Sequence, residues 1–123
     1  GLREPVLRVG NMTAERDFTD VRDVARAYFA LIRLGEPGEI YNICSGQPRS
    51  VQALLDAMLS RSQKAISVEL DPARMRPADT PVSYGSHDKL SSATGWAPQI
   101  SFEQTVSDIL DDWRVRVRTG QGL

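Results

Sequence analysis

The feature that most constrains this chain is a series of helices with recognisable start signals, separated by short apolar segments. Asp20 stands before a run of apolar positions that share one helix face, and Gly35 follows the run as a helix-ending residue. Ser50 precedes a second run of this kind, and Ser101 with Gln104 has the spacing of a capping box. Because these helices alternate with strand-like segments, the sequence predicts an α/β arrangement with a parallel pair of strands.

Short β-branched or alternating segments supply the predicted strands. We expect strands over 5–10, 39–44 and 65–70, and a brief strand over 82–84. A short helix is expected over 86–95, where Gly95 closes it. The remaining polar connectors, which include the segments 11–18 and 71–81, show no periodicity and are expected to be loops.

The three longer helices each carry an apolar face that we expect to be buried. The expected buried positions are Val21, Val24, Ala25, Tyr28, Leu31 and Ile32 in the first helix, Val51, Leu54, Leu55, Met58 and Leu59 in the second, and Phe102, Val106, Ile109 or Leu110, Trp113 and Val117 in the last. With 123 residues the chain has the size of one domain, so we expect a single domain over 1–123.

Charge and cysteine content exclude several kinds of partner and site. A formal net charge of −1 gives no overall field for nucleic acid or an anionic membrane, and we expect neither as a partner. The single Cys44 forbids an internal disulfide and fits a reducing, cytoplasmic setting. One cysteine and one histidine, His87, cannot form a cluster of thiolates or imidazoles, so we predict no metal site.

The sequence holds no glycine-rich dinucleotide loop, no P-loop and no nucleophile elbow. We therefore predict none of these three kinds of site, and we select no catalytic residue. Cys44 is expected to be a small core residue, and Trp96 a packing anchor. We expect His87 to cap the short helix or to make a surface hydrogen bond.

Two arginines in polar connectors are the candidate binding residues. Arg16 lies in "ERDF" ahead of the first helix, and Arg76 lies in "RPAD". A guanidinium offers planar bidentate donors to a phosphate, and Pro77 stiffens the loop that carries Arg76. Asp79 can accept hydrogen bonds from the vicinal hydroxyls of a sugar. The residues alone leave structural salt bridges open as the other interpretation.

Several motifs in order resemble a known family. They read "RDFTDVRDVARAY", "GEIYNICSGQ", "DPARMRPAD" and "GSHDKL", followed by "GWAPQIS" and a downstream "DDW". Together they resemble the C-terminal part of the extended short-chain dehydrogenases/reductases, the NAD-dependent epimerase/dehydratase family. The resemblance runs from about Pro5 to Trp113. Within the family it is strongest to the GDP-sugar branch, and to GDP-4-keto-6-deoxy-D-mannose reductases more than to GDP-mannose 4,6-dehydratases.

The resemblance implies a nucleotide-sugar site. It places Arg16 and Arg76 on the nucleotide diphosphate and Asp79 on the ribose hydroxyls. Arg74 and Met75 are close enough in the chain to line the same pocket. Asn11, in the strand-end "VGN", is expected near the nucleotide.

The chain also departs from the family pattern. The family's Tyr-x-x-x-Lys pair is missing, because the residues four positions after the three tyrosines are Ile32, Ser45 and Asp88. We therefore expect an α/β C-terminal fragment of a Rossmann-type extended short-chain dehydrogenase, with a few short, partly parallel strands and three to four helices. Its N-terminal cofactor-binding part is expected to be absent, so no cofactor is predicted on this chain, whereas the full-length enzyme would use NADP or NAD.

The favoured interpretation is the GDP-sugar-binding portion of a GDP-4-keto-6-deoxy-D-mannose reductase, which is not catalytically competent alone. The alternatives are the same portion of a GDP-mannose 4,6-dehydratase, or a non-catalytic binding or assembly module. Without the N-terminal half, an apolar face and an unpaired strand edge should be exposed. We therefore expect the chain to form a homo-oligomer that covers this face.

Overall fold

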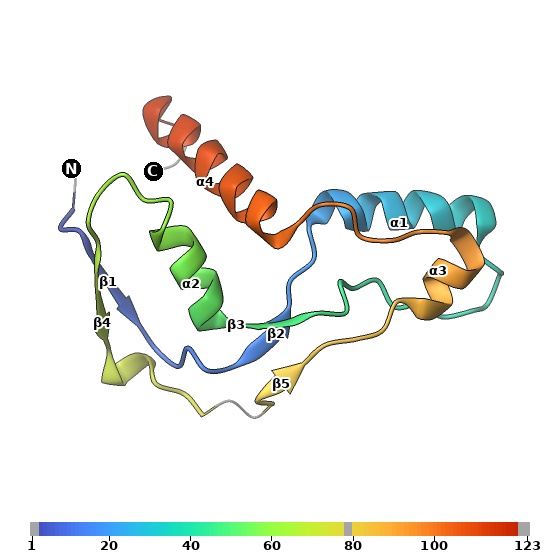
Figure 1. The fold of residues 1–123 in the computed structure, drawn as a ribbon, viewed down its shortest axis with the longest axis horizontal. Helices are drawn as coiled ribbons and strands as arrows, with labels where there is room; N and C mark the ends of the chain where they lie inside the picture. The colour runs from blue at the N-terminus through green and yellow to red at the C-terminus, as the bar shows by residue number, and fades with distance from the viewer. Residues whose placement is uncertain (1–2, 78–79, 121–123) are drawn as a thin grey trace.

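A computed structural model describes residues 3–77 and 80–120. Four α-helices, five short strands and one 3₁₀ turn follow one another along these residues (Figure 1). The elements are β1 Val6–Val9, β2 Glu15–Asp17, α1 Val21–Leu34, β3 Pro48–Ser50, α2 Val51–Leu59, β4 Ser67–Leu70, η1 Pro72–Arg74, β5 Val82–Ser83, α3 Asp88–Thr94 and α4 Phe102–Arg118.

The strands form two small sheets, and both contain a parallel pair. In the first sheet β1 pairs with β4 in parallel, from Val6 beside Ser67 to Val9 beside Leu70. In the second, β2 is central: it runs antiparallel to β3 and parallel to β5. Figure 1 shows the second sheet in the middle of the molecule, between the β1–β4 end and the end formed by α1 and α3. The predicted α/β class and its parallel strands are therefore confirmed.

All three predicted capping residues begin a helix. The Asp20, Ser50 and Ser101 side chains each accept a hydrogen bond from a backbone N–H in the first turn. At Ser101 only half of the predicted capping box forms. The Ser101 hydroxyl oxygen accepts from the Gln104 N–H at 3.1 Å, but the Gln104 amide donates to Asp108 at 2.6 Å.

The best-packed core lies between α1 and α3. Ala27, Leu90 and Trp96 are buried there, with Leu31 and Tyr41 among the partly buried residues around them. The Trp96 indole N–H donates to the backbone carbonyl of Asp23 at 3.0 Å, so the one polar group of this buried ring has a hydrogen-bond partner. Gly95 ends α3 in the left-handed conformation, with φ of 73°. Trp96 is thus the packing anchor that the sequence predicts.

The predicted strand over 39–44 does not form. None of the described strands lies beside this segment, and Ile40 is 82% exposed. An apolar strand needs a neighbour to satisfy its backbone groups, which the described residues do not provide here. Conversely, β2 and β3 form in segments expected to be loops, because each of these three-residue strands has a neighbour to pair with.

The predicted buried faces of α1 and α4 are also only partly correct. In α1 the apolar residues divide between two sides: Ala27 is buried, whereas Tyr28 and Ile32 are 59% and 84% exposed. In α4 Val106 is buried, but Trp113 is half exposed. Since α4 has 17 residues and its neighbour α2 only 9, the last turns of α4 extend beyond the helix that covers its beginning.

Candidate functional site

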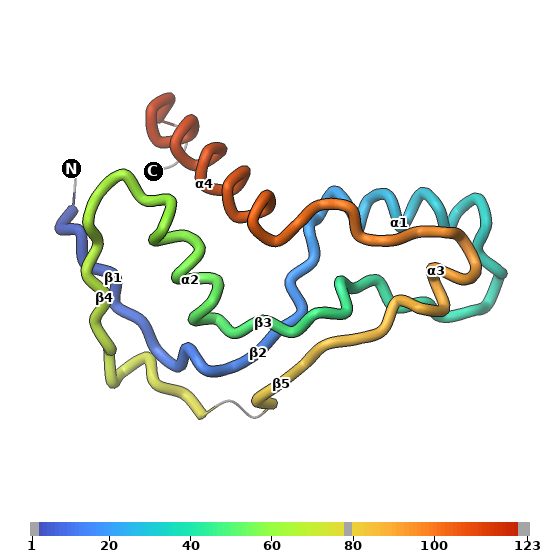
Figure 2. The backbone as a smooth tube through the Cα atoms, in the orientation of Figure 1, coloured from blue at the N-terminus to red at the C-terminus, as the bar shows by residue number. Residues whose placement is uncertain are grey.

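Residues 9–16 run beside two distant stretches, 71–77 and 80–83, along one edge of the molecule (Figure 2). Backbone hydrogen bonds tie both ends of the pair: the Asp71 N–H donates to Val9 O at 2.9 Å, and the Glu15 N–H donates to Pro81 O at 2.8 Å. β2 and β5 then continue the contact as a parallel ladder. The two connectors that the sequence selects as binding loops are thus brought together.

Asn11 joins the two segments at their midpoint. Its Nδ2 donates to the Arg76 carbonyl at 3.3 Å. Its Oδ1 accepts from the Thr13 N–H at 3.0 Å and from the Thr13 hydroxyl at 2.7 Å, which is a side-chain-stabilised turn. Next to it, a Cβ on Gly10 would lie 2.2 Å from the carbonyl oxygen of Arg74, so only glycine permits this close approach.

A cavity of about 420 Å³ lies beside the first of these segments and is also lined by β4, by Gln52 of α2 and by Met75. Its apolar wall comes from β1, β4 and Met75, and its polar side chains come from Asn11, Thr13 and Gln52. The lining residues are Val9, Gly10, Asn11, Met12, Thr13, Gln52, Val68, Leu70 and Met75. An apolar wall with a few polar groups at its rim is typical of a site for a small molecule.

The two loop arginines are held differently. Arg74 forms an ion pair with Asp71 at 3.1 Å, and Asp71 also accepts from the Ala73 N–H at 3.0 Å. Arg74 is therefore partly engaged within its own turn. Arg76 offers its backbone carbonyl to Asn11, and the residue is exposed. Asp79, the third predicted residue of this loop, lies outside the described residues.

Arg16 lies on the central strand β2, half-buried, and its guanidinium donates to the Glu15 carbonyl at 2.7 Å. The next residue, Asp17, anchors the strand from the other side. Its carboxylate accepts from the Ser45 and Gly46 N–H groups at 2.8 and 2.9 Å and from the Ser45 hydroxyl. Burial alone would raise the pKa of Asp17, but these hydrogen bonds outweigh it and lower the pKa. β2 is therefore a firm support for Arg16.

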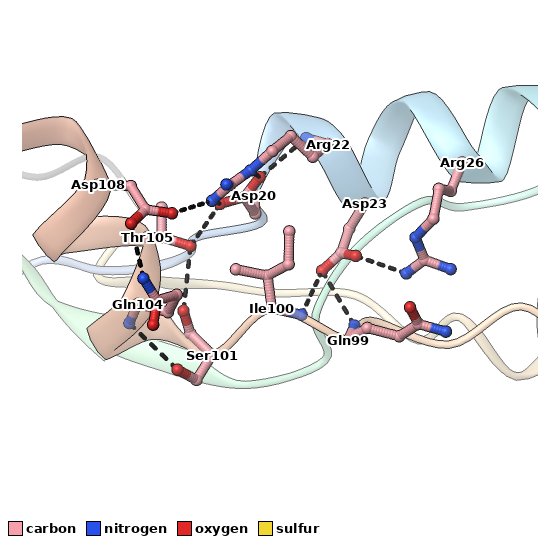
Figure 3. Close-up of polar contacts among 10 residues, drawn as sticks. All are labelled: Asp20, Arg22, Asp23, Arg26, Gln99, Ile100, Ser101, Gln104, Thr105 and Asp108. Atoms are coloured by element: carbon pink, nitrogen blue, oxygen red, sulfur yellow. Dashed lines mark hydrogen bonds and ion pairs between the residues drawn. The ribbon is translucent and has the colours of Figure 1, made fainter. Parts of the chain in front are cut away.

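Two buried carboxylates that the sequence did not single out as buried hold α1 against the segment before α4 (Figure 3). Asp20 is 7% exposed and accepts from the Arg22 side chain and from the Thr105 hydroxyl at 2.7 Å. Asp23 is 0% exposed and accepts from the Gln99 and Ile100 N–H groups at 3.1 and 3.0 Å. We call Asp20, Asp23 and these partners the carboxylate clasp.

The clasp carboxylates are stabilised in their ionised form. The Arg22 side chain holds the pKa of Asp20 far below its usual range, although burial opposes it. Burial likewise would raise the pKa of Asp23, but the Arg26 side chain and the Ile100 and Gln99 amides lower it overall. Each of their four carboxylate oxygens accepts at least one hydrogen bond from the protein, which makes the clasp a structural feature. Asp23 sits among the apolar positions of α1, the one sequence signal of its burial.

Cys44 is buried and His87 is half-buried. Cys44 is 8% exposed, as predicted for a core residue, and burial raises the pKa of its thiol. The prediction that His87 caps α3 is wrong, because its side chain makes no capping hydrogen bond. Its Nδ1 is buried and has no hydrogen-bond partner among the described residues, and its ring packs edge-on against Trp96 with 5.5 Å between the ring centres. Within residues 3–77 and 80–120, no group of three metal-ligating side chains comes together. Nor is any helix in that part of the chain long and apolar enough to cross a membrane.

Comparison with known proteins gives consistent matches. The sequence profile of the GDP-mannose 4,6 dehydratase family matches residues 1–109. The chain is 42% identical over 118 residues to GDP-6-deoxy-D-mannose reductase of Pseudomonas aeruginosa, covering 96% of this chain and 39% of that protein. It is 28% identical over 109 residues to GDP-mannose 4,6 dehydratase 2 of Arabidopsis thaliana, covering 86% and 29%.

A solved structure shows the same fold. The structure of RMD from Pseudomonas aeruginosa complexed with NADPH superposes with a TM-score of 0.87 at 39% sequence identity. The match covers 94% of this chain and 38% of that one. The chain therefore spans about two fifths of the length of this relative.

Proposed function

Because the chain belongs to the GDP-mannose 4,6 dehydratase family, we propose that it binds the GDP part of a GDP-sugar and forms the substrate-binding portion of a sugar-modifying enzyme. The family resemblance inferred from the motifs is confirmed, and the chain corresponds to the C-terminal part of its relatives. Its own residues supply binding groups, and the chemical step is assigned to the remainder of a longer enzyme.

The observation that carries this proposal is the pairing of the segments 9–16 and 71–83. It brings the Asn11 amide beside the Arg76 carbonyl, and Asn11 and Met75 both line a cavity of about 420 Å³. The β2–β5 ladder brings Arg16 to the end of the same edge. Apolar surface for a base and guanidinium groups for phosphates are what a nucleoside diphosphate requires.

Each predicted site residue has a role in the proposal. Arg16 and Arg76 bind the diphosphate, and Asp79 accepts from the ribose hydroxyls. Met75 and Asn11 border the cavity, which receives the base. Arg74 supports the loop through Asp71 and adds positive charge beside the cavity.

A reductase acting on a GDP-4-keto-6-deoxy-hexose is the favoured complete enzyme, since the identity to the reductase is 42% and that to the plant dehydratase 28%. A dehydratase of GDP-mannose is the second candidate. The relative solved with NADPH suggests a nicotinamide cofactor for the complete enzyme. Residues 1–123 do not fit that cofactor themselves, because no glycine-rich turn precedes any of the four helices and no Tyr-x-x-x-Lys pair occurs.

Calorimetric titration of the chain with GDP, GDP-mannose and UDP tests the proposal. We expect GDP and GDP-mannose to bind, and Arg76→Ala to abolish the heat of binding because a diphosphate contact is lost. Arg33→Ala is the matched control, since it removes an exposed arginine from α1. Absence of binding at millimolar GDP would contradict the proposal and favour a non-catalytic assembly module.

A homo-oligomer is the partner we propose for the exposed side of α1. Val21, Tyr28 and Ile32 lie on this side and are 76%, 59% and 84% exposed, which is unusual for a stable free surface. Light scattering should show self-association that Ile32→Glu abolishes. A clean monomer at high concentration would contradict it.

A further inference from the structure

Three polar residues lie in register across the second sheet. Arg49 on β3 is directly opposite Arg16 on β2, and Ser83 on β5 pairs with Arg16 on its other side. Residues in register on neighbouring strands project to the same face, and strands are about 4.8 Å apart. Two guanidinium groups and a hydroxyl therefore start from one row about 10 Å long. We call Arg49, Arg16 and Ser83 the cross-strand row.

The row carries more positive charge than the protein balances. Like charges directly opposite each other destabilise a strand pair. Among the carboxylates of residues 3–77 and 80–120, none forms an ion pair with Arg16. The ion pair of Arg49 with Glu103 is at 4.0 Å, and the Glu103 side chain is 58% exposed. An exposed pair of this length offsets little of the repulsion.

Arg49 is nevertheless held in place. Its guanidinium lies over the Phe102 ring at 4.6 Å from the ring centre, and Phe102 packs against Phe18 at 5.9 Å. One of its N–H groups donates to Gln47 at 3.4 Å. Stacking uses the flat face of a guanidinium and leaves donors at its edge. A positioned arginine loses less side-chain entropy when it binds an anion.

We infer that Arg49 and Ser83 extend Arg16 into an anion-binding row that takes the diphosphate of a nucleoside diphosphate. The inference rests on the proposed function and adds two residues that neither the motifs nor the family resemblance selects. Arg16 and Arg49 donate to the phosphate oxygens, and the Ser83 hydroxyl donates from the edge strand. An anion between the two guanidinium groups also removes their mutual repulsion.

Titrations with GDP, pyrophosphate and guanosine separate phosphate binding from base binding. Arg49→Gln should weaken GDP and pyrophosphate about tenfold, the worth of one charge-assisted hydrogen bond. Ser83→Ala should weaken both about threefold, as for a neutral hydrogen bond. Guanosine affinity should not change in either variant. Arg33→Gln on α1 removes the same charge far from the row in sequence and should leave all three affinities unchanged.

Glu103→Gln tests the inference in the opposite direction, because it should increase the affinity for pyrophosphate. It removes the negative charge beside Arg49 and should tighten pyrophosphate about twofold, because the row then has a higher positive potential. A purely structural role of the Arg49–Phe102 stack does not predict tightening. Arg49→Lys, which keeps the charge, should retain more pyrophosphate affinity than Arg49→Gln, and thermal melts establish that each variant is folded.

The outcomes distinguish this inference from the proposed function. If GDP binds and Arg16→Gln or Arg76→Ala weakens it, but Arg49→Gln does not, the row is overturned and the proposed function stands. If Arg49→Gln weakens guanosine as much as pyrophosphate, the row is also overturned. If the unmodified chain binds neither GDP nor pyrophosphate, both fail.

Discussion

The carboxylate clasp and the loop formed by residues 71–77 and 80–81 both join segments that are distant in the sequence, but they do so by different means. In the clasp, Asp23 is fully buried and accepts from the Arg26 side chain of its own helix and from two backbone N–H groups of the connector before α4. The loop is held by backbone hydrogen bonds and by one hydrogen bond from the Asn11 side-chain amide. The Arg74 side chain is 65% exposed and Met75 is 51% exposed.

This difference indicates that the clasp supports the fold, whereas the loop is suited to bind a ligand. Buried charge-assisted hydrogen bonds are costly to break, so the clasp fixes α1 and the start of α4. Segments with few buried apolar contacts and exposed side chains open at low free-energy cost. Residues 71–77 can therefore adjust to a ligand more easily than the clasp can, which is the usual division between a binding loop and its framework.

The largest expected effect comes from removing a clasp carboxylate. Asp23→Ala leaves the Gln99 and Ile100 N–H groups without their acceptor, and we expect a loss of about 3 kcal/mol in the free energy of unfolding. Urea denaturation measures this loss. Asp112→Ala is the control, because it breaks an exposed pair with Arg116 on α4 and should cost less than about 0.5 kcal/mol. Equal losses in the two variants would remove the distinction between the regions.

Acid should lower the free energy of unfolding through the clasp carboxylates. The folded-state pKa values of Asp20 and Asp23 lie below the ordinary value, so their stabilisation is fully present above the unfolded-state pKa of about 4. It is lost as pH falls below about 4 towards the folded-state values. Unfolding free energy measured between pH 6 and pH 3 should fall less steeply in Asp20→Asn. An identical slope in the variant would contradict the role of Asp20.

A smaller effect on stability, with a larger one on binding, is expected at the loop. Asn11→Ala removes the hydrogen bond from the side-chain amide to the Arg76 carbonyl and the hydrogen bond that stabilises the turn at Thr13. It should lower the free energy of unfolding by only about 1 kcal/mol. GDP affinity should fall several-fold, because the loop must then be ordered by the ligand. Thermal melting and calorimetry on the same samples check both values. Unchanged GDP affinity would mean that Asn11 does not position the loop.

Local signals made much of the fold predictable. Asp20, Ser50 and Ser101 each cap a helix through atoms within three residues, so the sequence alone identifies them. The strands were harder, because β2 and β3 are three residues long and exist only through pairing with distant segments. The segment 39–44 shows the reverse case: its composition suits a strand, but none of the described strands pairs with it.

The sequence predicted which residues belong to the candidate site better than it predicted how they are arranged. The motifs selected Arg16, Asn11 and the 74–76 stretch, but only the structure shows Asn11 donating to the Arg76 carbonyl. Arg49 gave no motif signal, since its position opposite Arg16 depends on the register of two short strands. Asp23 was missed because a buried acid in an amphipathic helix depends on donors supplied 76 and 77 residues away.

The most direct test of the central claim is a titration of ¹⁵N-labelled protein with GDP, followed by amide chemical shifts. We predict that the shifts concentrate in residues 9–16 and 71–83, because residues 9–13 and Met75 line the cavity and backbone hydrogen bonds join the two segments. We also predict that α1 residues 22–34 are unaffected. Chemical-shift changes in the two segments that saturate with GDP, and that are lost in Arg76→Ala, would establish the site. Shifts confined to α1, or none at millimolar GDP, would contradict it.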